Sequence, residues 1–134
     1  MKSNDRAFRP GFRMSAQDAL VLAASGTATA MLWPGHRPLA IAVAFVVLHF
    51  FLFCNVVRMA RRLELVWAAA CLALLGASLG FGLLELARAL WLTSMGTVAL
   101  AFVQLRRPDY HGVGWRRINP GLTAWWAARQ QARS

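Results

Sequence analysis

Charged residues are scarce in this sequence, and acidic residues are the scarcest. Only 15% of the 134 residues are charged, with five Asp and Glu against fifteen Lys and Arg. A soluble domain has about 25% charged residues, because it must cover its surface with polar groups. The apolar share of 58% also exceeds the ~45–50% of an ordinary domain. The composition excludes a typical soluble fold and indicates a single small membrane domain.

The motifs that accompany most enzyme classes are also missing. The sequence has no Gly-rich phosphate loop, no paired carboxylates, no Ser nucleophile elbow and no His-x-x-x-His pair. Cys54 and Cys71 both lie in apolar runs, so no disulfide framework is indicated. A metal site that combines both thiols with His49 is disfavoured, because His49 and Cys54 lie ~140° apart around a helix. We expect no bound metal ion, and the missing motifs argue against an enzyme.

Long apolar runs dominate the chain and predict four transmembrane helices. Their expected ranges are 16–33, 38–58, 64–84 and 87–106. Each is followed by a turn or a charged cluster, and the connections are short enough for neighbouring helices to be antiparallel. The sequence therefore predicts an all-α integral membrane protein, a four-helix up-down bundle.

Local signals place some helix ends better than others. Ser15 and Asp18 have the spacing of a capping box at the start of the first helix. Pro38 suits the first turn of the second. The end of the third helix is the least defined, because Gly80 and Gly82 both precede the expected limit at residue 84.

The two tails carry most of the positive charge. The N-tail, 1–15, holds four Lys and Arg, the connection after the second helix holds three, and the C-tail, 107–134 with Arg106 beside it, holds six. The opposite side has only Arg37 and Arg88. By the positive-inside rule this predicts that both tails are cytoplasmic. A single Lys among fifteen basic residues is typical of a GC-rich bacterial genome, so the expected location is a bacterial inner membrane.

These patterns also allow two other interpretations. A nucleic-acid binder would gather its basic residues on one water-facing element, whereas here they flank apolar runs, so we expect no nucleic-acid partner. A signal peptide is suggested by Ala28, Thr29 and Ala30, which resemble a cleavage site. The long preceding region that contains Asp18 is unusual for a signal peptide, so we expect the first helix to be retained.

Three polar residues form a possible intramembrane site. His49 lies midway along the second predicted helix, where a polar ring is costly and often functional. It is a candidate for a quinone or haem contact, although hydrogen bonding to a Ser or Thr of a neighbouring helix is the more ordinary role. Asn55 and Arg58 are three residues apart and can share a face near the inner interface. Arg58 can bind a lipid phosphate or simply reach the headgroups.

Small and aromatic residues suggest how the chain packs and where it meets lipid. Gly76 and Gly80 form a small-xxx-small motif that commonly seats a neighbouring helix of the same bundle. A C-terminal amphipathic helix is expected at 122–133, lying in the cytoplasmic headgroup region or against a partner subunit. The predicted interfacial anchors are Trp67, Trp115, Trp125, Trp126 and Arg129.

These features favour a non-catalytic function. Anchors, packing motifs and a basic aromatic tail without a catalytic set predict a small accessory or assembly subunit of a larger membrane complex. Its partners are then the lipid bilayer and other membrane subunits. A small homo-oligomeric transporter or channel is the alternative, and a redox or lipid-modifying enzyme that uses His49 is the third.

Overall fold

The computed structural model of the protein describes residues 8–132, and every regular element in that range is a helix. The helices are α1 (Ala16–Leu32), α2 (Arg37–Phe51), η1 (Leu52–Val57), α3 (Arg61–Leu75), η2 (Gly76–Gly80), α4 (Leu86–Leu105), α5 (Trp115–Ile118) and α6 (Leu122–Gln131). The elements η1 and η2 are π-helical turns that continue α2 and α3. The first seven residues of the predicted N-tail, and residue 133 of the predicted C-terminal helix, lie outside the described range.

Three of these helices are long and apolar enough to cross a membrane. They cover residues 37–57, 61–80 and 86–105, with 21, 20 and 20 residues. The expected all-helical architecture is confirmed, and three of the four predicted spans have the length and apolar character of membrane helices. The remaining predicted span corresponds to α1, which is apolar but has 17 residues.

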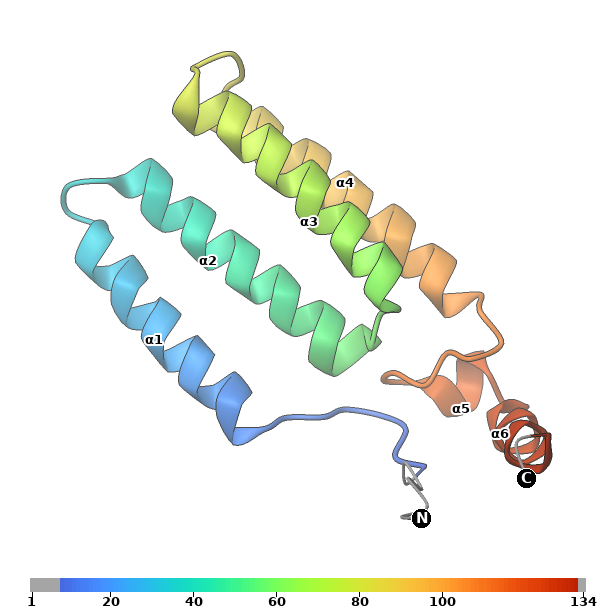
Figure 1. Cartoon of the computed structure of the whole chain (residues 1–134). Helices are drawn as coiled ribbons and strands as arrows, with labels where there is room; N and C mark the ends of the chain where they lie inside the picture. Colours follow the sequence, from blue (N-terminus) through green and yellow to red (C-terminus); the bar gives the residue numbers. More distant parts are fainter. Residues whose placement is uncertain (1–7, 133–134) are drawn as a thin grey trace.

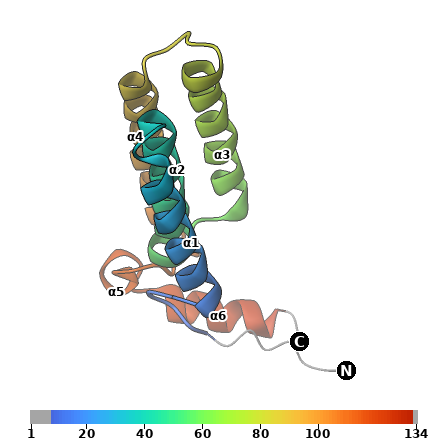
Figure 2. The same cartoon turned by 90° about the vertical axis from the view of Figure 1, so that its left-hand side faces the viewer.

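The long helices form two antiparallel hairpins that lie side by side (Figure 1). One hairpin is α1 with α2, and the other is α3 with α4. The connections 33–36 and 81–85 lie at one end of the molecule, and both tails and the connection 58–60 lie at the other (Figure 1). Figure 2 shows α6 lying crosswise to the long helices at this second end.

The core lies between the two hairpins and leaves α1 at the edge. Its buried members are Ala42, Phe53, Trp67, Cys71 and Leu75. In contrast, α1 has no buried residue, and its main packing partner is α2. The apolar surface of α1 is therefore free to contact lipid or another protein.

The helix ends follow local chemistry. The predicted capping box is confirmed, because the Asp18 carboxylate accepts from the Ser15 backbone N–H at 2.7 Å and the Asp18 N–H donates to Ser15 Oγ at 3.2 Å. The third long helix ends at Gly80, the earlier of the two expected stops, and Gly82 then has a left-handed φ of +63°. Such a conformation costs glycine little, which explains the break before residue 84.

The two glycines of the small-xxx-small motif are not closely packed within the chain. A Cβ atom added at Gly76 or Gly80 would meet no atom within 4 Å. Although α4 contacts η2, neither glycine is in close contact with another described helix, so close helix packing at this motif stays a prediction. This face is open.

Candidate functional site

His49 lies in an aromatic cluster rather than in a polar one. Its ring stacks on Trp67 at 5.4 Å with an interplanar angle of 14°, and the Phe45 ring is 4.0 Å away. Nδ1 lies 2.8 Å from the Phe45 carbonyl oxygen. A carbonyl oxygen only accepts, so this hydrogen bond assigns the proton to Nδ1. The histidine is thus satisfied by its own helix and not by a Ser or Thr of a neighbour.

Asn55 and Arg58 make hydrogen bonds that are separate from that of His49. Asn55 is 3% exposed, and its side-chain N–H donates to the Phe51 carbonyl at 3.2 Å. Arg58 follows the π-turn η1 with a left-handed φ of 52°. That break in the helix directs the chain away from its axis, so the three residues expected at one intramembrane site occupy three different environments.

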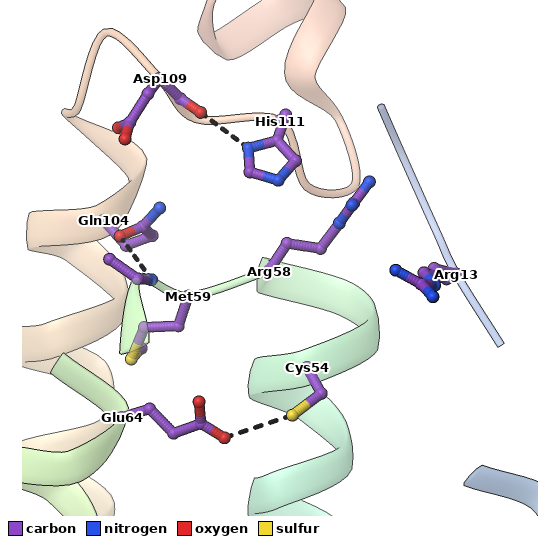
Figure 3. Close-up of a pocket in the computed structure, with 9 residues that line it drawn as sticks. Arg13, Cys54, Arg58, Met59, Glu64, Gln104, Asp109 and His111 are labelled. Carbon is purple, nitrogen blue, oxygen red and sulfur yellow. Dashed lines mark hydrogen bonds between the residues drawn. The ribbon is translucent and has the colours of Figure 1, made fainter. Parts of the chain in front are cut away.

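A pocket of about 300 Å³ lies where the two tails meet η1. Figure 3 shows its polar side chains, which come from the N-tail, η1, the start of α3, the end of α4 and the C-tail. They are Arg13, Cys54, Arg58, Glu64, Gln104, Asp109 and His111. Of the residues predicted to form a site, only Arg58 lines this pocket. We call the region that surrounds it, residues 8–14, 52–60 and 107–131, the end layer.

Backbone hydrogen bonds join the segments of the end layer. Gly11 N–H donates to the His111 carbonyl at 2.7 Å, which connects the N-tail to the C-tail. Arg13 N–H donates to the Asn55 carbonyl at 3.1 Å, and Val113 N–H donates to the Val56 carbonyl at 2.8 Å. Both tails are therefore fixed to η1, and the pocket between them has defined walls.

Close packing of the C-tail on η1 depends on Gly112. A Cβ atom there would lie 2.5 Å from the Val57 carbonyl oxygen and 2.6 Å from that of Val56. Beside it, Tyr110 is 2% exposed and donates its hydroxyl to the Val113 carbonyl at 2.7 Å. Burial raises the pKa of the Tyr110 phenol, which keeps it a neutral donor.

The two carboxylates of the pocket are both engaged. Asp109 accepts two hydrogen bonds from Arg107, at 2.9 and 3.1 Å, and these lower its pKa below 3.8. Glu64 Oε1 accepts from the Cys54 thiol at 3.3 Å. Within residues 8–132, neither Arg13 nor Arg58 has a carboxylate oxygen within 4 Å. No described carboxylate is thus a close counter-ion of these two guanidinium groups.

Aromatic residues complete the end layer. The Phe8 ring lies 6.0 Å from Trp115 and 5.5 Å from Trp126, so these two predicted anchors also hold the N-tail. The Arg129 guanidinium lies 4.9 Å from the centre of the Trp125 ring. Leu122 is fully buried, so the apolar face of α6 packs partly on the protein itself.

Trp67 differs most from its expected role. The sequence indicated a lipid-facing anchor, but Trp67 is 3% exposed and its Nε1–H donates to Thr97 Oγ1 at 2.8 Å. A buried indole N–H needs an acceptor, and α4 supplies one. Trp67 is thus a core residue that joins α3 to α4.

Comparisons with protein families, with curated proteins and with solved structures find no match to this chain. The function is therefore argued from the open helix faces and the end layer. Sequence reasoning identified Arg58 but not its neighbours Arg13, Glu64 and His111. A partial signal lies in the run from Tyr110 to Arg117, because its glycines and aromatic residues are typical of an ordered turn.

Proposed function

We propose that the chain is a four-span membrane protein and a non-catalytic accessory subunit of a larger membrane complex. In addition to the three longer helices, α1 is taken as a span. Its 17 residues extend about 26 Å, and α1 runs antiparallel along α2 (Figure 1). That length suits the thinner end of the range of hydrocarbon cores.

The distribution of charge supports a cytoplasmic end layer. Ten basic residues of the described range lie at that end: Arg9, Arg13, Arg58, Arg61, Arg62, Arg106, Arg107, Arg116, Arg117 and Arg129. The other end has Arg37 and Arg88, and Arg88 is paired with Glu85 at 3.3 Å. Basic residues concentrate on the cytoplasmic side of inner-membrane proteins. The proposed location is a bacterial inner membrane.

The observation that carries the accessory role is the open surface of the spans. Between 17% and 28% of each candidate span is buried within the chain, and α1 has no buried residue. The small face at Gly76 and Gly80 is unoccupied. In a membrane, such small-residue faces allow the close approach of a helix from another subunit.

Extraction in a mild detergent tests this role. A tagged full-length chain is expected to migrate with other subunits on a native gel. Gly76→Leu is expected to release it, because the larger side chain blocks the open face of η2. Ala70→Leu is the matched control, because Ala70 is exposed on a different side of α3.

Two results would overturn the accessory role. One is recovery of the wild-type chain as a single monodisperse species. The other is co-purification of two differently tagged copies with no other subunit, which would instead favour a homo-oligomeric transporter or channel. Labelling of single cysteines at positions 35 and 119, in a variant without Cys54 and Cys71, tests the orientation separately. Only position 35 is expected to react with a reagent that cannot cross the membrane.

A further inference from the structure

The pocket of the end layer has the properties of a small anion site. We propose that it binds a phosphate group through Arg13 and Arg58, the phosphate belonging to an anionic lipid headgroup or to a free phosphate ion. The proposal goes beyond the accessory role and does not depend on it. It rests on the positions of the two guanidinium groups, the backbone at Arg58 and the size of the pocket.

The two guanidinium groups lie on the same side of the pocket. Figure 3 shows Arg13 and Arg58 together there, with Glu64 across from them. Arg58 donates one N–H to the Arg9 carbonyl, which leaves its remaining donors for a ligand. Arg13 is held by its backbone hydrogen bond to Asn55 at 3.1 Å. Paired guanidinium donors are well suited to phosphate, because each can present two parallel N–H groups.

Like charges held near each other favour an anion between them. Burial lowers the pKa of Arg58, and the nearby charge of Arg13 lowers it further. A guanidinium keeps its proton under these conditions. The cost of burying the Arg58 charge and its repulsion by Arg13 therefore remain in the folded protein. Asp18 attracts Arg13 electrostatically but forms no ion pair with it within 4 Å. A bound phosphate would neutralise both groups directly.

The backbone at residue 58 gives an independent reason to look for a role of its side chain. Arg58 has a φ of 52°, in the left-handed region that usually takes Gly or Asn after a helix. A side chain with a Cβ is disfavoured there, so glycine would suit the fold better. Arginine at this position is accounted for if its guanidinium has a ligand.

The remaining charges of the pocket set the expected selectivity. The Asp109 carboxylate is occupied by Arg107 and points away from the pocket in Figure 3. His111 Nδ1 lies 2.7 Å from the Asp109 carbonyl oxygen, an acceptor that again assigns the proton to Nδ1. Among the described residues that line the pocket, Glu64 is the carboxylate that faces the space, and its charge would repel a phosphate. Removing that charge is therefore expected to strengthen binding.

The volume limits the size of the ligand. A pocket of about 300 Å³ is at the lower end of the range for small-molecule sites. It has room for a phosphate with a short ester group. The pocket lies beside the ends of three membrane-length helices. In the proposed membrane arrangement, this position would correspond to the depth of the lipid phosphates.

The test uses the full-length chain, purified in detergent and delipidated. Short-chain phosphatidylglycerol and inorganic phosphate are titrated in separate experiments, and binding is followed by the shift of the unfolding temperature and by native mass spectrometry. Arg13→Gln and Arg58→Gly are each expected to weaken binding about tenfold or more, the effect of losing a charge-assisted hydrogen bond. Glu64→Gln is expected to strengthen it. Arg58→Gly also relieves the left-handed backbone, so this variant should fold.

Arg62→Gln is the matched control, because Arg62 is exposed at the same end and does not line the pocket. It is expected to change binding by less than about twofold, since an exposed charge acts weakly at a distance. If the variants change the binding of phosphatidylglycerol alone in this way, the ligand is a lipid headgroup. If they change the binding of inorganic phosphate in the same way, the ligand is a free phosphate ion. Absence of binding of either probe would overturn the proposal. So would an equal loss in Arg62→Gln and Arg58→Gly, which would indicate general attraction to the basic surface.

Discussion

Replacing Gly112 by alanine is expected to detach the C-tail from η1. The added methyl group would lie 2.5 and 2.6 Å from the carbonyl oxygens of Val57 and Val56. Both are backbone atoms of a helical turn and cannot rotate away as a side chain can. The chain must therefore move at Gly112 or lose the contact.

The cost of this substitution follows from two effects. Overpacking a close contact costs typically 1–3 kcal/mol. The displacement also weakens the hydrogen bond from Val113 N–H to the Val56 carbonyl, 2.8 Å long, and such a bond contributes about 0.5–1.5 kcal/mol. We expect the region around residue 112 to be destabilised by about 2–4 kcal/mol. The helical bundle should remain folded, because the core between α2, α3 and α4 is not touched.

Hydrogen exchange at the Val113 amide measures this directly. Its protection reports the equilibrium between the attached and detached tail. A loss of 2–4 kcal/mol corresponds to protection lowered by roughly thirty-fold to several hundred-fold. Gly121→Ala is the control in the same tail, because a Cβ there meets no atom within 4 Å. Unchanged protection of Val113 in Gly112→Ala, or an equal loss in both variants, would refute the packing argument.

Three further predictions concern individual contacts. Ser15→Ala should destabilise α1 by about 1 kcal/mol through loss of the capping box, seen as faster amide exchange in its first turn; no change there would contradict the cap. Trp67→Phe and Thr97→Val, combined in a double-mutant cycle of unfolding in mixed micelles, should show a coupling of about 0.6–2 kcal/mol for their 2.8 Å hydrogen bond, and strict additivity would disprove it. Arg107 lowers the pKa of Asp109, so this pair stabilises the turn fully above pH 3.8, and the stabilisation is lost as the pH falls through the lowered pKa. Exchange of the Tyr110 amide should reveal that loss, and Asp109→Asn should remove the pH dependence; an unaltered pH profile in Asp109→Asn would contradict the assignment.

The sequence predicted those features that depend on neighbouring residues. Long uncharged runs identified the three membrane-length helices, because apolar length is a local property. The capping box was predictable for the same reason, because Ser15 and Asp18 lie within one helical turn of each other. Gly80 was one of the expected ends of the third long helix. Apolar residues follow it, so composition alone was equally compatible with a longer helix.

Features that depend on distant residues could not be predicted. The role of Trp67 depends on Thr97, thirty positions away, and a helix that is apolar on all sides does not reveal which face is buried. The left-handed conformation of Arg58 results from the π-turn before it, for which the sequence carries no established signal. The pocket depends on contacts of the N-tail with residues near the other end of the chain.

The hydrogen bond from Gly11 to the His111 carbonyl has a consequence for biosynthesis. Translation releases Gly11 before the long helices and His111 only after all of them have been made. The bond can form only when both residues are on the same face of the bilayer, so an odd number of crossings would keep them apart. For the proposed four-span chain, contact between the two tails would mark an insertion in which all four helices cross the membrane. A chain that inserted wrongly would leave both tails loose and open to proteolysis.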